Sequence, residues 1–434
     1  MENTREIVLE GLLTVEKELS FSNKLVSDIL DKYDYLDPRD KAFIKRLFEG
    51  TTERRIELDY HINNLASVPV RKMKPLIRCI MRMSAYQILY MDNVPDSAAI
   101  NEAVKLAKKR KFANLSGFVN GVLRNLSREK ENLKWPDAKK DAVTYLNVRY
   151  SIPEWMVEKW LGLYGFDETE KLMASLLEIH PVSLRFRSNM SDAEREELVK
   201  KIEALGVDLK QDDRLKYVYR AQHLENIREL PGYDDGAFVV QDVSSCLAVE
   251  AAGIKENDLV IDACASPGGK SLLASEKTGN GGRVISRDIS EAKLVRIEEN
   301  AERMQADNIT SQVWDASVFD TSLEEKADVL ILDVPCSGLG ILGKKRDIKY
   351  NATAEGLKDL ADIQKSIVKA SWKYVKKGGT LLYSTCTINP DENEKNVEWI
   401  CREFPFSIEK GPVQLLPHKD DCDGFFYTVL KRND

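Results

Sequence analysis

The sequence predicts a multidomain protein with an all-α N-terminal domain, a small α+β connecting domain and a C-terminal α/β domain built on a doubly wound sheet. Three observations support this. Apolar residues recur at helical spacing over residues 1–135, residues 182–187 alternate as a strand does, and from Ala237 short apolar strands alternate with helical runs. The length of 434 residues, at about 150 residues per domain, agrees with three domains.

The predicted N-terminal domain comprises residues 1–140. Helical periodicity recurs along it, most clearly in residues 77–89, and Asp37-Pro38 is a signal for the start of a helix. Because glycine is sparse and no strand-loop-strand pattern occurs, we expect this domain to be entirely helical.

The connecting domain is predicted to span residues 141–235, and the C-terminal domain residues 236–434. In the connecting domain, helical stretches surround a strand over Val182–Arg187 whose polar face carries two arginines. In the C-terminal domain, strands separated by helices are typical of parallel βαβ units. Ligands of such sheets bind at the carboxyl ends of the strands, so the residues that follow each strand are candidates for chemistry.

Composition excludes several classes of protein. No run approaches the ~18 apolar residues of a membrane-spanning helix, and the charged start lacks the apolar core of a signal peptide. Seven cysteines without C-x-x-C spacing argue against a disulfide framework, and four scattered histidines do not form a zinc site. We therefore expect a cytoplasmic protein with free thiols, no metal and no membrane contact. Because no coiled-coil pattern occurs, we expect a monomer.

Charge is distributed unevenly along the chain, whose net charge is −7. Residues 1–140 contain 26 Lys and Arg against 20 Asp and Glu, a net charge of +6, and within them residues 71–140 contain 16 against 6, a net charge of +10. A basic region in an acidic chain is a weak indication of polyanion binding. A solvated charged helical surface explains the same numbers equally well.

A glycine turn between a strand and a helix is the first motif that indicates chemistry. The strand ends at Asp262, and the turn then runs Cys264-Ala265-Ser266-Pro267-Gly268-Gly269-Lys270. Glycines let a backbone approach a ligand closely. A G-x-G-x-x-G fingerprint is absent, and a P-loop matches only at the end of the turn, because Cys264 replaces its first glycine. The third interpretation is a site for S-adenosylmethionine, whose amino-acid moiety would lie over the turn.

Two acids further along the chain favour the third interpretation. Asp288 follows the next strand, where a carboxylate can bind ribose hydroxyls. Asp315 follows Gln312-Val313-Trp314, where a carboxylate can accept from an adenine amine. A single aspartate at such a position is usually a cap or turn residue, but a series at consecutive strand ends indicates a ligand.

Two cysteines also follow predicted strands. Cys336 lies just after Asp333, at the end of the strand Val329–Leu332, and Cys386 follows the strand Thr380–Tyr383. A lone cysteine is more often an inert core residue. Two cysteines at strand ends of one sheet indicate a role for the thiolate, which is the reactive form of the side chain.

Methyl transfer to carbon 5 of a pyrimidine explains the need for thiols. That carbon is not nucleophilic until a thiolate adds to carbon 6, and a base must later remove the carbon 5 proton. Two cysteines and one carboxylate, Asp333, suit this sequence of events. Lys270 is the candidate cation that would lower the pKa of a nearby thiol.

Three segments resemble the motifs of the RNA 5-methylcytosine methyltransferases: residues 262–270, 333–337 and 384–393. The N-terminal region resembles the NusB-type RNA-binding helical fold, on the cues Leu36–Asp40 and Phe118–Arg124. The combination implies a Rossmann-like methyltransferase domain that uses S-adenosylmethionine, and 16S ribosomal RNA as the substrate.

The resemblance also implies the cofactor-binding residues. The backbone of Cys264–Lys270 would bind S-adenosylmethionine, Asp288 its ribose and Asp315 its adenine side. Asp333 would lie near both the methyl group and the target base.

For catalysis, the resemblance implies that Cys386 is the nucleophile and that Cys336 assists product release, with Asp333 and Lys270 beside them. DNA cytosine-5 enzymes use the Pro-Cys cysteine instead. The order of the two cysteines therefore comes from the resemblance and not from the chemistry.

The sequence departs from the family pattern at three positions. Ser266 stands where alanine is common, Arg287 precedes Asp288 where a small or apolar residue is usual, and Arg346 stands where proline is frequent. The basic loop 344–350 around Arg346 either contacts phosphates or lies in solvent. Two other functions stay open at this point: a P-loop-like NTPase, and a non-catalytic RNA-binding or antitermination factor.

Overall fold

The computed structural model describes residues 3–18, 22–178, 181–224 and 226–434. Contacts between residues divide the chain into two compact units. The first, here called the helical unit, comprises Met1–Glu178 and Leu342–Ala352, and the second, the sheet unit, comprises Ile179–Ile341 and Thr353–Asp434. The division into three domains at residues 140 and 235 remains a prediction, and residues 141–178 group with the helices that precede them.

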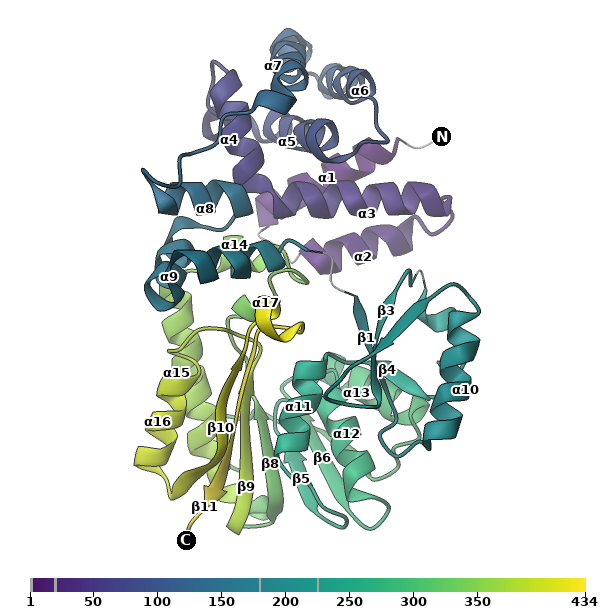
Figure 1. Ribbon diagram of the computed structural model, residues 1–434, viewed down its shortest axis with the longest axis vertical. Helices are drawn as coiled ribbons and strands as arrows, with labels where there is room; N and C mark the ends of the chain where they lie inside the picture. Colours follow the sequence, from purple (N-terminus) through teal and green to yellow (C-terminus); the bar gives the residue numbers. More distant parts are fainter. Residues whose placement is uncertain (1–2, 19–21, 179–180, 225) are drawn as a thin grey trace. The chain divides into compact units, whose positions relative to one another are not determined.

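The described residues of the helical unit form helices and no strand (Figure 1). These helices are α1 (Thr4–Glu18), α2 (Ser22–Lys32), α3 (Pro38–Glu53), α4 (Arg55–Leu65), α5 (Pro75–Tyr90), α6 (Asp96–Lys109), α7 (Ser116–Glu129), α8 (Ala142–Tyr150), α9 (Glu154–Ser175) and α14 (Ile348–Asn351).

Helix α5 forms the centre of the helical unit and packs against α1, α3, α4, α6 and α7. Ile77, Ile80 and Met81 of α5 are buried, and each such side chain contributes about 1.5–3 kcal/mol of burial free energy. Helix α3 begins where the sequence predicted, since the Asp37 carboxylate accepts a hydrogen bond from the N–H of Arg39. The expectation of a helical N-terminal region is confirmed.

The basic loop 344–350 is only partly solvated: Lys344 and Lys345 are exposed, whereas Arg346 is partly buried and Lys349 is buried. Arg346 donates to Glu53 at 2.9 Å and pairs with Glu49 at 3.1 Å. Lys349 is only 2% exposed, and burial lowers its pKa to about 7. The loop is therefore a structural part of the helical unit, because its charges meet acids of α3.

The sheet unit contains a small antiparallel sheet of four strands in the order β2-β3-β1-β4. The strands are β1 (Val182–Phe186), β2 (Asp208–Gln211), β3 (Val218–Gln222) and β4 (Phe238–Val240), with α10 (Asp192–Glu203) between the first two. The predicted strand with two arginines is β1, and Arg185 is fully buried where it donates to Gln241 and Glu276.

A larger sheet of seven strands follows, in the order β10-β11-β9-β8-β5-β6-β7. Its strands are β5 (Leu259–Asp262), β6 (Arg283–Asp288), β7 (Ile309–Val313), β8 (Ala327–Asp333), β9 (Val375–Thr385), β10 (Phe406–Leu415) and β11 (Phe425–Arg432). Neighbours among β5 to β9 are parallel, which confirms the predicted βαβ units, whereas β10 and β11 join the β9 edge as an antiparallel pair.

Helices cover both faces of this sheet, as Figure 1 shows. They are α11 (Val243–Ala251), α12 (Gly269–Thr278), α13 (Glu291–Arg303), α15 (Ala354–Ser371) and α16 (Glu394–Glu403), with a short α17 (Pro417–Asp420) before β11. Successive residues of β8 alternate between two cores: Val329 and Ile331 pack with α11 and α12, and Leu330 packs with α15 and α16. The parallel strands therefore end at one common edge.

Among the described residues, no helix combines the length and apolar character needed to cross a membrane.

Candidate active site

The glycine turn connects β5 to α12 at the common edge. Gly268 caps α12 with φ +102, a conformation that favours glycine, and a Cβ on Gly269 would approach Gln241 to 3.1 Å. Asp262, at the end of β5, is fully buried and accepts a hydrogen bond from Ser271 Oγ at 2.7 Å. Burial raises the pKa of Asp262 to about 7. The turn is thus held close to the strand ends.

Asp288 lies at the end of the next parallel strand, β6, and bonds back to the glycine turn. Its Oδ2 accepts from the N–H of Ser266 at 3.1 Å, while Oδ1 accepts from the N–H of Ile289 at 2.7 Å and from Lys293 Nζ at 2.9 Å. The carboxylate is 6% exposed and faces a cavity beside the turn. It is therefore fixed in place before any ligand binds.

The cavity beside the turn has a volume of about 540 Å³, which is within the usual range for small-molecule sites. Five of the predicted site residues line it: Cys264, Ser266, Asp288, Asp315 and Asp333. Its walls also include apolar side chains that could cover a purine, namely Ile289, Ile363 and Ile367 together with Trp314. A wall with fixed carboxylates and an apolar slot fits a nucleoside carrying a hydroxylated ribose.

The other predicted cofactor residues lie behind this wall. Ala265 is buried and its N–H donates to Arg287 O, while Pro267 O accepts from Asn300. Gly268, Gly269 and Lys270 continue into α12. Cys264 reaches the cavity, but burial raises the pKa of its thiol, so it stays protonated and unreactive at neutral pH.

Asp333 connects the cavity to the two cysteines. Its Oδ2 pairs with Lys270 Nζ at 2.7 Å, and its Oδ1 accepts from Ser384 Oγ at 2.8 Å. The sulfur atoms of Cys336 and Cys386 are 3.3 Å apart, and both side chains are partly exposed. Four side chains predicted from the sequence therefore lie together at the ends of β8 and β9 and the start of α12: Asp333, Cys336, Cys386 and Lys270.

Cys386 influences the protonation of Cys336. The hydrogen bond to Cys386, burial and the charge of a Cys386 thiolate together raise the pKa of Cys336 well above its usual range. Burial alone would lower the pKa of Lys270, but the Asp333 carboxylate outweighs it and the pKa is raised, so the ammonium persists. The Cys336 thiol therefore keeps its proton at neutral pH.

Sequence reasoning missed a buried carboxylate that joins the two cysteine loops. Glu392 is fully buried and accepts from the N–H of Ser337 at 2.9 Å and from Ser337 Oγ at 2.5 Å. It also accepts from Asn389 Nδ2 at 2.8 Å and Gln364 Nε2 at 2.9 Å. In the sequence, Glu392 lies within the polar run Asp391–Glu394, just after the loop that follows a predicted strand. Such a run is usually explained as solvated surface charges.

Arg287, which departs from the family pattern, is accommodated by its neighbours. It is 3% exposed, pairs with Asp320 at 2.5 Å and donates twice to Gln312. Its guanidinium also lies 4.7 Å from the ring centre of Trp314, a cavity residue. Arg287 therefore packs behind the cavity wall and supports Trp314.

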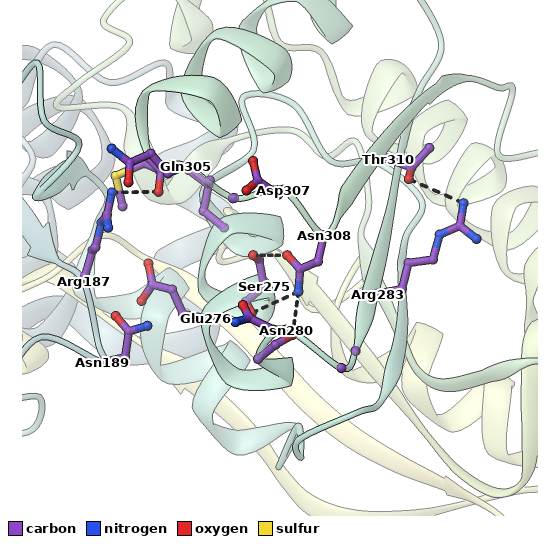
Figure 2. Close-up of a pocket in the computed structure, with 16 residues that line it drawn as sticks. Arg187, Asn189, Ser275, Glu276, Asn280, Arg283, Gln305, Asp307, Asn308 and Thr310 are labelled. Carbon is purple, nitrogen blue, oxygen red and sulfur yellow. Dashed lines mark hydrogen bonds between the residues drawn. The ribbon is translucent and has the colours of Figure 1, made fainter.

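A larger cavity, of about 730 Å³, lies at the opposite, amino-terminal end of the strands (Figure 2). Several of its polar side chains already have partners: Asn308 bonds Ser275, and Arg187 donates to Met304 O at 2.8 Å. None of Asp288, Asp315 and Asp333 lines it, whereas all three line the smaller cavity, so we assign the cofactor site to the smaller cavity. Among the residues with described positions, no group of three or more His, Cys, Asp or Glu side chains could hold a metal ion.

Comparisons with known families match both parts of the chain. Residues 250–431 match the family described as 16S rRNA methyltransferase RsmB/F, and residues 2–128 match the NusB family.

Individual proteins give the same picture. A probable ribosomal RNA small subunit methyltransferase B of Bacillus subtilis (strain 168) is 34% identical and covers 99% of both chains. A protein of the same name from Synechocystis sp. is 31% identical over 100% of both. The solved structure of PH0851 has a TM-score of 0.80 at 23% identity, covers 99% of both chains, and so shares the fold.

Proposed function

Because the chain belongs to the RsmB/F family of 16S rRNA methyltransferases, we propose that it methylates carbon 5 of a cytosine through a covalent bond from Cys386. The methyl donor of this enzyme is S-adenosylmethionine, as the sequence predicted. Membership of the family confirms the predicted methyltransferase activity and replaces the NTPase and non-catalytic interpretations. The observation that carries the cytosine-5 proposal is the pair of sulfurs 3.3 Å apart, on the loops that follow Asp333 and Ser384, two residues that are themselves hydrogen-bonded.

The cofactor site is the cavity of about 540 Å³. We assign ribose binding to Asp288 and the adenine side to Asp315, whose carboxylate is exposed at the rim and accepts from Ser317. When bound there, S-adenosylmethionine supplies an electrophilic methyl group. Asp333 lies in the same wall, so the methyl group and the target base would meet next to it.

The first step is the attack of the Cys386 thiolate on carbon 6. A carbon–sulfur bond forms at carbon 6, the electrons of the 5,6 double bond shift so that carbon 5 becomes the nucleophilic end of an enamine, and N3 takes up a proton that the Lys270 ammonium supplies through the Asp333 carboxylate. Asp333, oriented by Lys270 and Ser384, would hydrogen-bond the base edge and hold it over the sulfurs. Carbon 5 then takes the methyl group, and the electron pair of the broken methyl–sulfur bond leaves with the donor.

The release step uses Cys336 as base. Once Cys386 is a neutral thioether, the hydrogen bond and the charge that raised the pKa of Cys336 are gone, so this thiol becomes easier to deprotonate. Its thiolate removes the carbon 5 proton, the carbon 6–sulfur bond breaks towards Cys386, and N3 returns its proton. The coupling of the sulfurs therefore makes the base available only after the attack.

This coupling predicts a change in thiol reactivity. In the Cys386→Ala variant, the pKa of Cys336 should fall, because its hydrogen-bond partner and the neighbouring charge are removed. Alkylation of Cys336 by iodoacetamide, followed by mass spectrometry of its peptide, should then occur at lower pH than in the wild type. An unchanged pH profile would show that the two sulfurs titrate independently.

Cofactor binding is tested at Asp288. A charge-assisted hydrogen bond contributes about 1.5–3 kcal/mol, so Asp288→Ala should weaken S-adenosylmethionine binding by roughly 10- to 150-fold in calorimetry. Asp307→Ala, at an exposed acid in the larger cavity, is the control and should bind normally. Equal affinity of the folded Asp288→Ala variant would remove Asp288 from the site.

We also propose that the enzyme is a cytoplasmic monomer. Both the cavity and the cysteine pair are built from a single chain. All seven cysteines are free, as in a reducing compartment. Light scattering of the purified enzyme should give the mass of one chain, 49.3 kDa, and a mass near twice that value would contradict the proposal.

A further inference from the structure

We propose that a cavity in the helical unit, here called the arginine cavity, binds a phosphate group of the RNA substrate. It has a volume of about 270 Å³ and is lined by residues of α1, α3, α4, α5 and the segment 347–351. Three arginines face it: Arg55, Arg78 and Arg82. The inference rests on the proposed function, because it assumes that the substrate is RNA.

Two of the three arginines already have acidic partners. Arg78 donates twice to Glu16, at 2.7 and 2.9 Å. Arg82 donates twice to Asp59, at 2.6 Å each, and once to Glu16 at 2.6 Å. Besides Glu16, the acid that lines the cavity is Asp347, which also has a partner of its own. The carboxylates near the cavity are therefore engaged.

Arg55 is different. Within the described ranges, no oxygen accepts a hydrogen bond from its guanidinium, which lies 3.9 Å from the ring centre of Tyr350. The side chain is partly buried, and burial lowers its pKa. A guanidinium stacked on an aromatic ring keeps its edge free, and that edge matches two oxygens of a phosphate. Placing an anion there would satisfy donors that are costly to leave unpaired.

The stacking partner is itself held firmly. Tyr350 Oη donates to Glu53 O at 2.9 Å and lies 3.4 Å from Ser151 O. Arg346, four residues earlier, is held by Glu49 and Glu53. Thr51 and Thr52 add hydroxyls to the lining. The cavity is thus a preformed site, and the chain that leads away from the Cys336 loop forms part of it.

The RNA backbone is the anion that the observations favour. Residues 71–140, which include Arg78 and Arg82, carry a net charge of +10. A phosphodiester is offered by every nucleotide, so such a contact fixes position without reading sequence. A protein carboxylate could use the same donors, and the test separates the two.

The test compares two arginine variants of the full-length enzyme. Arg55→Gln should reduce affinity for unmodified, deproteinised 16S rRNA by about 10-fold in filter binding. The slope of log affinity against log salt concentration should become shallower by about one. Arg39→Gln, at an exposed position of α3, should change affinity less than about 2-fold. If Arg55→Gln bound rRNA as tightly as the wild type, or if its affinity fell no further than that of Arg39→Gln, the inference would be wrong.

Folding and ligand type are checked separately. Since no oxygen of the described residues accepts a hydrogen bond from the Arg55 guanidinium, removing this partly buried charge should leave the melting temperature of Arg55→Gln the same as that of the wild type, or higher, in RNA-free buffer. Inorganic phosphate should raise the melting temperature of the wild type more than that of Arg55→Gln, whereas poly-glutamate should not. Stabilisation by poly-glutamate alone would overturn the RNA assignment. Wild-type methylation of cytosine reports on the proposed function independently, because it does not depend on Arg55.

Discussion

The Cys386→Ser variant should form no covalent complex with RNA and should lose turnover by at least about 1000-fold. A serine hydroxyl is a far poorer nucleophile than a thiolate at neutral pH. Burial and hydrogen bonding of the neighbouring loop should be unchanged, so cofactor affinity should be normal. Single-turnover methylation of unmodified 16S rRNA measures the effect.

A mechanism-based trap provides the control for this result. With 5-fluorocytosine in the target position, elimination is blocked because no proton is present on carbon 5. The wild type should then accumulate a protein–RNA complex that survives a denaturing gel, and Cys386→Ser should not. Adducts from Cys386→Ser would assign the attack to another residue.

The Cys336→Ala variant should give the opposite pattern. It retains the attacking sulfur, so it should add to carbon 6 and transfer the methyl group. It lacks the base for release, so it should stall as a covalent complex on unmodified RNA and turn over at most about once. Denaturing gels with labelled RNA measure the complex. If Cys336→Ala turned over normally, or if it formed no adduct while Cys386→Ser did, the roles would be reversed or absent.

Much of the site was predictable because its chemistry follows strand ends. Asp262, Asp288 and Asp333 each end a parallel strand, and parallel strands place their carboxyl ends at one edge whatever the loops do. The same reasoning located Cys336 and Cys386 before any distance was known. The order of their roles came from family resemblance, since the chemistry allows either sulfur to be the nucleophile.

Other features depend on contacts between distant parts of the sequence. Glu392 looks like a surface acid, yet Ser337, Gln364 and Asn389 enclose it, and none of these is marked as a partner by local pattern. Similarly, Arg346 lies in a basic loop that the sequence left as either solvated or in contact with phosphates, because its acidic partners Glu49 and Glu53 lie about 300 residues earlier, on α3. The antiparallel pair β10 and β11 was not anticipated, since its place at the β9 edge is set by tertiary packing.

The most direct test of the proposed reaction is the identity of the methylated nucleoside. Purified enzyme is incubated with unmodified 16S rRNA and S-adenosylmethionine carrying a deuterated methyl group, and the digested RNA is analysed by liquid chromatography and mass spectrometry. The sulfur pair predicts that the label appears in 5-methylcytidine and disappears in Cys386→Ser. Label in N4-methylcytidine or in 2′-O-methylcytidine, neither of which needs a thiol, would contradict the account.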